Sequence, residues 1–230
     1  AYILGPDHYL TVTHAIVAMS VTQGNSAPAS RAYGSHAIIL SGAYGQYQQA
    51  LQFADLAIEV DRRYQHLYTP EVQFQKAAAV LPWVAPLAQS LDSLESNIYL
   101  AMDDSNIEFA VHSALFFGFY LCLSGKPLDR VNVQMDKYAR FIMDKRIPYN
   151  LEFINLWRQY VLNLREDEQD PLLLAGPAFD EAVQVEVLEQ TQNLTILFCY
   201  HSVKLMLAYL HDDLELAAHH YQAAEPLAAV

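Results

Sequence analysis

The chain has 230 residues, of which 53% are apolar and 17% charged, fewer charges than the roughly 25% of an average soluble domain. At this length about 70% of the unfolded surface can be buried, so a sizeable core needs neither disulfides nor a metal. The formal net charge of −13 leaves 13 Lys and Arg spread along the chain, which is no basic footprint for a phosphate backbone. We therefore expect no nucleic-acid partner.

We also expect neither a membrane-spanning segment nor a secretion signal in this sequence. No stretch approaches the ~18 uninterrupted apolar residues of a spanning helix, and the most apolar one, FAVHSALFFGFYLCL, contains His112 and Ser113. Cys122 and Cys199 stand in apolar surroundings and form no disulfide framework. We expect a cytoplasmic protein without membrane insertion. The opening AYILGPDHYL has neither an initiator Met nor a basic leader, so we also expect a segment of a longer chain.

Helical periodicity dominates the sequence, and alternating strand patterns are absent. Short breaks rich in Gly, Pro, Asn, Asp and Ser separate the periodic segments. The pattern predicts helices near residues 7–22, 28–43, 46–65, 70–81, 84–101, 105–122, 127–145, 149–164, 178–190, 193–210 and 213–226. The fold class is therefore all-α.

Two of the breaks carry specific helix signals, and one is longer than the rest. Thr69-Pro70-Glu71 is typical of a cap, a proline at the first helical position and an acid in the first turn. Ser124-Gly125-Lys126-Pro127 indicates a helix end followed by a helix start. The longer break, REDEQDPLLLAGPA, covers residues 165–178.

A stripe of large apolar residues and alanines recurs in three of the predicted helices. A large residue followed three positions later by Ala lets two antiparallel helices approach closely. The stripes consist of Tyr47, Ala50, Leu51, Ala54 and Ala57; of Ile107, Ala110, Val111, Ala114 and Phe117; and of Leu214, Ala217, Ala218, Tyr221 and Ala224.

This pattern resembles the second helix of a tetratricopeptide repeat, with Gly45 at the usual glycine position of the first copy and Asp212 there in the third. The resemblance implies a single helical-repeat domain over residues 1–230, a superhelix of antiparallel helix pairs. We expect its helix pairs to keep the packing rule without a constant repeat length.

A second resemblance covers most of residues 84–225, while residues 1–83 follow the same helical layout with weaker motifs. The segments that carry it are FFGFYLCLSGKPLDRV, YNLEFINLWRQYVLNLRED, DPLLLAGPAFDE and QTQNLTILFCYHSVKLMLAYLHDDLELAAHH. In order and spacing they resemble one region of large bacterial signalling proteins that join a serine/threonine-kinase-like domain, an AAA-type ATPase, a helical segment, a GAF domain and a sensor histidine kinase.

The resemblance implies the helical part of such a protein, after the ATPase and before the GAF domain. Ser124-Gly125-Lys126-Pro127 lacks the glycine spacing and the magnesium-binding hydroxyl of a phosphate-binding loop, and neither H-R-D nor D-F-G occurs. We therefore expect no catalytic residue and no cofactor in this segment, with ATP bound in other domains of the parent protein.

The stretch HDDLELAAHH, residues 211–220, contains enough ligand-type side chains to suggest a metal site. On a helix Asp212, Glu215 and His219 share a face, but His220 points about 100° away from His219, and no second cluster completes four ligands. A histidine-kinase phosphoacceptor would be followed by a proline, which is missing here. We therefore expect a helix start capped by Asp212 or Asp213, with its histidines on the solvated side.

Acidic pairs elsewhere have a similarly simple interpretation. Asp103-Asp104, Glu166-Asp167-Glu168 and Asp180-Glu181 fall at breaks or helix starts, where acids are favoured. None has the spacing of a calcium-binding loop. We expect no metal site in the chain.

The aromatic residues offer one candidate ligand groove. Trp157 and Arg158 stand close in sequence to Tyr149, Phe153 and Tyr160, so an aromatic face and a guanidinium could meet a ligand there. Core packing between helices explains the same residues and is the favoured interpretation.

The helical pattern favours a non-catalytic scaffold, and the resemblance to signalling proteins implies that it couples the ATPase to the GAF and histidine-kinase modules by binding protein segments or neighbouring domains. A small-molecule sensor with an aromatic pocket and a stand-alone tetratricopeptide-like adaptor are the alternatives. The sequence does not indicate an oligomeric state.

Overall fold

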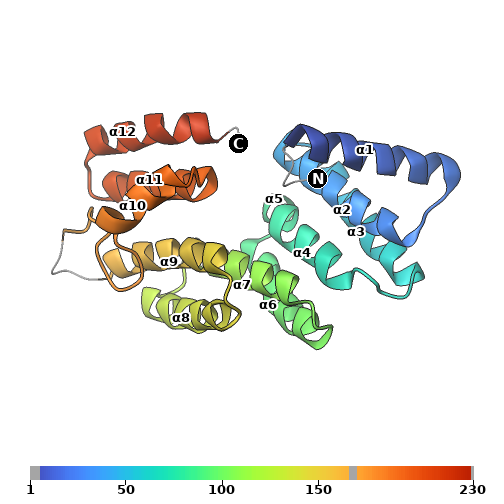
Figure 1. The fold of residues 1–230 in the computed structure, drawn as a ribbon, viewed down its shortest axis with the longest axis horizontal. Helices are drawn as coiled ribbons and strands as arrows, with labels where there is room; N and C mark the ends of the chain where they lie inside the picture. The colour runs from blue at the N-terminus through green and yellow to red at the C-terminus, as the bar shows by residue number, and fades with distance from the viewer. Residues whose placement is uncertain (1–5, 166–169, 229–230) are drawn as a thin grey trace. The chain divides into compact units, whose positions relative to one another are not determined.

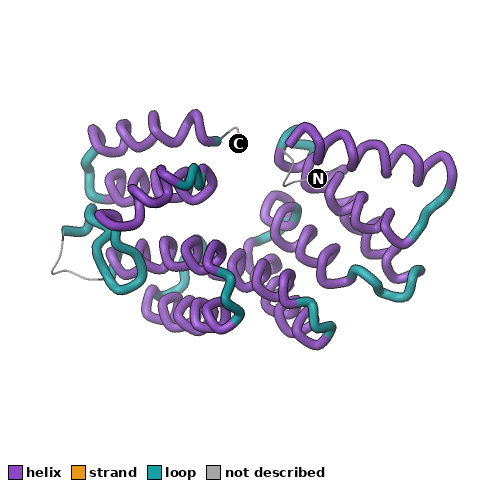
Figure 2. The backbone as a smooth tube through the Cα atoms, in the orientation of Figure 1, coloured by secondary structure: helices purple, strands orange, loops and turns teal. Residues whose placement is uncertain are grey.

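The computed structural model describes residues 6–165 and 170–228, without the side chains of residues 6–7 and 148–149. Helix accounts for 79% of the structure and these residues contain no strand, so the expected all-α class is confirmed (Figure 2). The helices are α1 Pro6–Gln23, α2 Ala27–Gly42, α3 Tyr47–Arg63, α4 Thr69–Ala79, α5 Leu81–Val84, α6 Leu87–Asp103, α7 Ile107–Cys122, α8 Leu128–Asp144, α9 Pro148–Asn163, α10 Glu181–Gln190, α11 Leu194–Leu210 and α12 Leu214–Ala224, followed by the 3-10 turn Glu225–Leu227 (Figure 1). None of the helices described is long and apolar enough to cross a membrane.

The chain divides into two compact units, residues 1–120 and residues 121–230. In the first unit α2 packs against α1, α3 and α4, and α4 packs against α6. In the second unit α8 packs on α9, α9 on α11, and α11 on α12. The expectation of a single domain stays a prediction.

Five of the turns between helices share one geometry. In each, a residue with a positive φ lies two positions before the first residue of the next helix: Gly45 (φ 63°), Ser105 (56°), Arg146 (58°), Gln192 (52°) and Asp212 (60°). A left-handed residue at this position ends a helix because it turns the chain away from the helical path. Three of these turns introduce the three helices that carry the recurring alanine stripe.

In three of these turns the residue after the left-handed one forms hydrogen bonds with both the preceding and the following helix. The backbone N–H groups of Asn106, Asn193 and Asp213 donate to carbonyls of the preceding helix, those of Ala101 (2.7 Å), Leu188 (2.9 Å) and Ala208 (2.9 Å). Their side-chain oxygens accept from backbone N–H groups of the next helix, those of Phe109 (3.3 Å), Ile196 (3.3 Å) and Leu216 (3.0 Å). One residue thus satisfies orphan groups of two helix ends.

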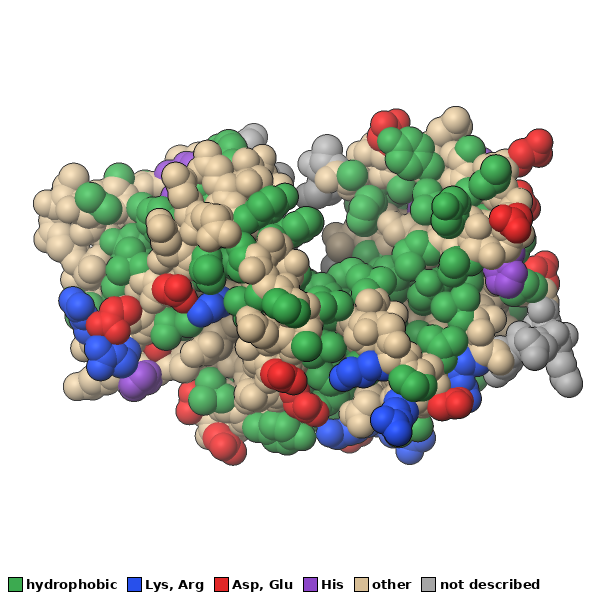
Figure 3. Space-filling view, turned by 180° about the vertical axis from the view of Figure 1, so that it is seen from behind, with side chains coloured by type: hydrophobic (Ala, Val, Ile, Leu, Met, Phe, Trp, Pro, Cys, Tyr) green, Lys and Arg blue, Asp and Glu red, His purple; other side chains and the backbone are tan. Residues whose placement is uncertain are grey.

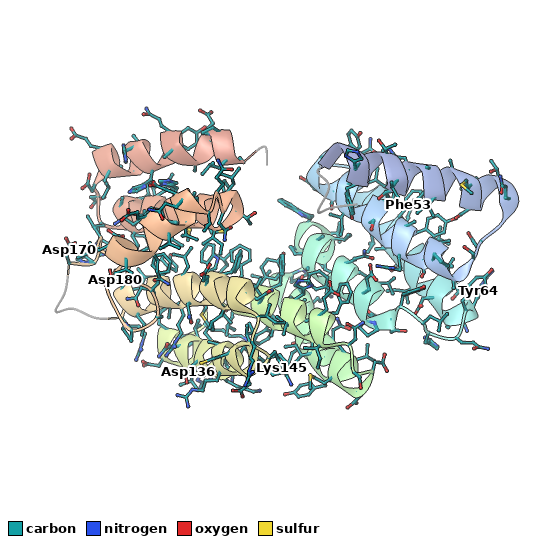
Figure 4. All side chains as sticks on the ribbon, in the orientation of Figure 1. Phe53, Tyr64, Asp136, Lys145, Asp170 and Asp180 are labelled. Atoms are coloured by element: carbon teal, nitrogen blue, oxygen red, sulfur yellow. The ribbon has the colours of Figure 1, made fainter. Side chains whose placement is uncertain are left out.

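The alanine stripe of α3 packs as the sequence predicts. Ala50, Ala54 and Ala57 are fully buried, and α3 lies against α2 in two apolar clusters. One cluster contains Ala57 with Tyr33, and the other contains Ala50 and Ala54 with Ala37 and Leu40. Phe53, which Figure 4 labels on α3, packs against both clusters from a partly buried position.

The start of α4 differs from the predicted cap. Thr69 is the first helical residue and Tyr68 precedes it without a side-chain cap, so Pro70 takes the second position. The Thr69 hydroxyl instead donates to the Asp61 carboxylate (2.6 Å), which also accepts from the Tyr68 N–H (2.8 Å). Asp61 is buried at the end of α3, so it fixes the connection between the two helices.

The long break before α10 is an ordered loop from residue 170 onward, with Asp170 and Asp180 near its two ends (Figure 4). Asn163 donates to the carbonyls of Pro171 (3.1 Å) and Leu173 (2.7 Å), and Gln159 Oε1 accepts from the N–H of Ala178 (3.2 Å). The predicted helix at residue 178 begins only at Glu181, because Asp180 is the N-cap and its side chain accepts from the Ala182 N–H.

A buried ion pair holds the same loop to α11. The Lys204 side chain is 7% exposed, and its ammonium lies 2.9 Å from the Glu181 carboxylate, whose side chain is 15% exposed. Lys204 also donates to the Leu172 carbonyl, and Glu181 accepts from the Leu174 N–H (3.2 Å). The loop therefore depends on one cation that α11 carries in a buried position.

Replacing Gly45 by Ala tests the shared turn. A Cβ at this position has open space, its nearest neighbour being the Tyr47 hydroxyl at 3.9 Å, so the left-handed φ is the main cost. We expect the free energy of unfolding to fall by about 1 kcal/mol, measured by urea denaturation.

Gly42 is the matched control for this substitution. It is the last residue of α2, has no neighbour within 4 Å of a built Cβ and has no positive φ. Gly42→Ala should therefore raise the free energy of unfolding by about 0.5 kcal/mol, since alanine is the better helix former. Shifts of the same sign in both variants would contradict the turn geometry.

Replacing Lys204 by Met tests the buried ion pair. The substitution leaves the Glu181 carboxylate buried without its cation, so we expect the free energy of unfolding to fall by about 3 kcal/mol. The double variant with Glu181→Gln should recover part of this loss. Lys76→Met removes the more exposed pair with Asp55, whose side chain is 57% exposed, and should cost below about 1 kcal/mol. Equal losses in Lys204→Met and Lys76→Met would argue against a special role for Lys204.

Candidate functional site

The candidate site is a groove in the first unit, with a volume of about 500 Å³, that lies among α1, α2, α4 and α7. Both apolar and polar side chains line it. The apolar ones include Tyr9, Val12, Ile16, Ile38 and Phe109, and the polar ones include Arg31, Ser35, Glu71, Gln75 and Glu108. A concave, mostly apolar surface with a few convergent polar groups is the usual form of a binding site.

An ion pair between α2 and α4 lies in this groove. Arg31 Nε is 2.6 Å from Glu71 Oε2, and the Glu71 side chain is only 12% exposed. The Arg31 guanidinium also lies over the Tyr68 ring, 5.1 Å from its centroid. Glu71 occupies the first turn of α4, where the helix dipole favours an acid.

The Arg31 guanidinium does not fully offset the cost of burying the charged Glu71 carboxylate. Burial raises its pKa above the ordinary value, the Arg31 guanidinium lowers it, and the charge of Glu108 raises it further. The net pKa shift is upward, so desolvation and Glu108 outweigh the single arginine. Among the described residues that line the groove, the carboxylates of Glu71 and Glu108 outnumber the one guanidinium of Arg31, so the formal charge of the lining is negative.

Gln75, one turn after Glu71, depends on a glycine in α2. Gln75 is 6% exposed, and its Nε2 donates to the Ser35 hydroxyl at 3.3 Å. A Cβ built on Gly34 would lie 1.8 Å from Gln75 Oε1, so only glycine allows the amide to pack between α2 and α4. This close approach fixes the distance between two walls of the groove.

An aromatic cluster fixes α7 and so positions Glu108. The Phe74 ring of α4 contacts the rings of Phe109 and His112, with centroids 5.7 and 5.6 Å apart. The Tyr120 hydroxyl donates to the Ala78 carbonyl at the end of α4. Burial is the largest influence on the pKa of His112 and lowers it, so a neutral imidazole is favoured at this position. Glu108 also lines the groove, and its side chain is exposed to solvent.

The polar residues of this groove are not marked by any motif in the sequence. Glu71 was interpreted as a helix-start acid, and neither Arg31, Gln75 nor Glu108 belongs to a motif. Because these polar residues come from three separate helices, α2, α4 and α7, no spacing along the chain could have brought them together.

The aromatic groove predicted around Trp157 lies in the second unit, on α9. Trp157 and Tyr160 are 4% and 5% exposed, so both rings contribute to the core, the interpretation favoured for them. Arg158 pairs with Asp136 of α8 at 2.7 Å, and Phe153 is partly buried. The side chain of Tyr149 lies outside the described residues. A ligand site at these residues stays a prediction.

The alanines of the second repeat copy pack as expected, whereas the third copy differs. Ala110 and Ala114 are fully buried and Ile107 is partly buried, while Tyr47 at the start of the first copy is 36% exposed. In α12 only Ala217 and Ala224 of the expected stripe are buried. Leu214 is 64% exposed, Tyr221 is 56% exposed, and Ala218 is also exposed, so the predicted packing is wrong for these three.

Tyr221, one of the exposed apolar residues of α12, borders a second hollow, of about 390 Å³, between α11 and α12. Phe198, Leu205, Met206 and Tyr221 line it together with Ala224. In the space-filling view of Figure 3, hydrophobic side chains (green) are visible at the surface of both units. This hollow is almost entirely apolar, in contrast to the charged groove of the first unit.

The stretch HDDLELAAHH is a helix start, as the sequence predicts, but one histidine is placed differently. Asp213 is the N-cap of α12, and Asp212 is the left-handed residue before it. His219 is exposed, whereas His220 is 6% exposed and faces α11, with its Nδ1 2.9 Å from the Nδ1 of His201. The expectation that the histidines face solvent is wrong for His220, because the buried face of α12 includes it beside Ala217 and Ala224.

The His201–His220 contact requires that one Nδ1 donates and the other accepts, so the two rings share a single proton between these atoms. In the described part of the chain no three His, Cys, Asp or Glu side chains are arranged to hold a metal ion. Glu166, Asp167 and Glu168, one of the acidic groups considered in the sequence, lie outside the described residues.

Comparisons with known proteins add no relative. No protein-family model, no curated protein and no solved structure matches the chain. The geometry of the two units is therefore the basis for any functional conclusion.

The histidine pair predicts a specific acid sensitivity. Burial and the charges of His201, Lys204 and His219 lower the pKa of His220 from 6.5 to about 4. Below pH 6.5 the unfolded chain binds a proton at this ring that the folded protein does not bind until about pH 4, so stability is lost as the pH falls through this range.

Urea denaturation at pH 7 and pH 5 tests this sensitivity. We expect His220→Gln, which keeps a hydrogen-bonding group but does not titrate, to lose about 1–2 kcal/mol less stability than the unaltered protein between these pH values. His211→Gln is the control, since this ring is exposed just before α12 and is not among the groups that lower the pKa of His220. An identical pH slope in all three proteins would exclude the proton-linked contact.

Proposed function

We propose that this chain is a non-catalytic scaffold whose helices form a tetratricopeptide-like superhelix and bind a protein segment in the groove of the first unit. The observation that carries the proposal is the groove itself, which combines an apolar wall from α1 and α2 with the Arg31–Glu71 pair and Glu108. Such a surface suits the alternating apolar and charged side chains of a peptide better than it suits a reaction centre.

Two features of the packing support the superhelix. Helix α2 contacts both the next helix and the one after it, and α9 contacts the helix before it, α8, and the second helix after it, α11. Helical-repeat proteins are built from this pattern, in which each pair buries its apolar face against its neighbours. The repeated turn before α3, α7 and α12 supports a common unit in the three copies of the stripe.

The resemblance to large bacterial signalling proteins supplies the proposed context. In that setting the scaffold would lie in the cytoplasm between an ATPase and a GAF domain and would couple them to a histidine kinase. Its partners would be segments of these domains. The reading frame that encodes the chain tests this context: ATPase motifs upstream and a histidine-kinase motif downstream are expected, and their absence would overturn the context while leaving the scaffold proposal intact.

Site-specific photo-cross-linking tests protein binding in the groove. Val12 lines the groove and is 45% exposed, so benzoylphenylalanine at this position can reach an occupant. In the full-length protein we expect ultraviolet irradiation to join residue 12 to one defined peptide segment, identified by mass spectrometry.

Val183 of α10, 63% exposed and outside the residues that line the groove, is the control position. The same products from positions 12 and 183, or none from position 12, would count against the scaffold. A small-molecule sensor would instead give no peptide product, and its melting temperature would rise when a cell metabolite extract is added.

A further inference from the structure

The charged groups of the groove do not balance. Among the described residues that line it, Arg31 is the one basic side chain, while Glu71 and Glu108 each bear a carboxylate. Arg31 is already engaged with Glu71 at 2.6 Å, and its side chain is half exposed, so water weakens its effect. The lining therefore has one carboxylate more than it has basic side chains.

We propose that the groove recognises a cationic side chain, lysine or arginine, presented by an otherwise apolar segment of the protein partner. The inference rests on the proposed function and specifies the chemistry of the segment. The carboxylates of Glu71 and Glu108 receive the cation, and the apolar residues of α1 and α2 contact the segment on either side of it.

Burial makes Glu71 the stronger recognition group. Its carboxylate is mostly shielded from water, and a charge-assisted hydrogen bond is stronger in such surroundings than at an open surface. Glu108 lies near enough for its charge to act on Glu71, and it is exposed, so an incoming cation can approach between the two. Binding removes the repulsion between the carboxylates as well as adding an attraction.

The apolar lining suits the stem of such a side chain. The methylene groups of lysine and arginine pack on apolar surface while the charged end remains at a polar group. Ile16 and Ile38 provide aliphatic surface, and the Phe109 ring, next to Glu108, provides a face on which a cation can rest. A neutral polar side chain such as glutamine could pack its methylene groups on the same apolar surface, but it would not neutralise the carboxylates of Glu71 and Glu108.

Fluorescence anisotropy with a set of labelled twelve-residue peptides tests the proposal. The peptides share one Ala- and Leu-rich frame and differ at the central position, which is Lys, Arg, Gln or Glu. We expect the Lys and Arg peptides to bind about five-fold more tightly than the Gln peptide, the affinity equivalent of one partly exposed ion pair, and the Glu peptide to bind least. The preference should decrease as the salt concentration rises.

Variants of the two carboxylates assign the preference to the groove. Glu71→Gln removes the buried carboxylate, and Glu108→Gln removes the exposed one, which carries little risk to folding. Each should reduce the preference for Lys and Arg over Gln, and Glu108→Lys should abolish it, because the new ammonium takes the place of the peptide's cation. Glu215→Gln changes the net charge equally on α12 and should leave the preference unchanged.

The outcomes separate this inference from the proposed function. If the peptides cross-link to position 12 but bind without regard to the central charge, the cation site is overturned and the scaffold stands. A Lys preference that Glu108→Lys leaves unchanged reflects general attraction to an acidic protein and also overturns the site. If no peptide binds and position 12 gives no cross-link in the full-length protein, both proposals fail.

Discussion

Both units depend on a turn in which one residue satisfies the ends of two helices. At Asn106, Asn193 and Asp213 the backbone N–H completes the preceding helix, and the side-chain oxygen begins the next. A helix leaves its terminal backbone groups unsatisfied, so a connection this short is stable only if both sets find partners within it. Short connections make consecutive helices antiparallel neighbours, and the buried alanines then allow them to approach closely.

Most of the helical layout could be predicted from the sequence, because periodicity and turn residues are local signals. The alanines of α3 and α7 follow from spacing alone, and so does a cap at Asp212 or Asp213, of which the structure has Asp213. The structure adds the short helix α5, since Ala85 is extended before Pro86 and delays the next helix to Leu87. These differences concern backbone conformation at prolines, where a periodic pattern gives little information.

Side-chain contacts between distant elements could not be predicted in the same way. Lys204 looks like an ordinary polar position of an apolar helix, yet it holds a loop more than twenty residues earlier in the chain. Likewise His220 has a polar side chain but lies on the buried face, where His201 of the neighbouring helix provides its partner. In both cases tertiary context compensates a polar group whose burial would otherwise be costly. The groove of the first unit has the same origin, because Gly34 and Gln75 become informative only when α2 and α4 are seen to touch.

The shared turn also determines where the chain can accept extra residues. Since Asn193 and Asp213 each serve two helices, one inserted residue would separate the two roles and rotate the following helix by about 100° relative to its partner. The alanine face of that helix would then turn away from the neighbouring helix, and larger side chains would contact the neighbouring helix in its place. Changes of chain length are therefore restricted to connections without a shared cap, such as the segment from Leu123 to Pro127 between α7 and α8, and the helix pairs can diverge in sequence far more freely than in the length of their turns.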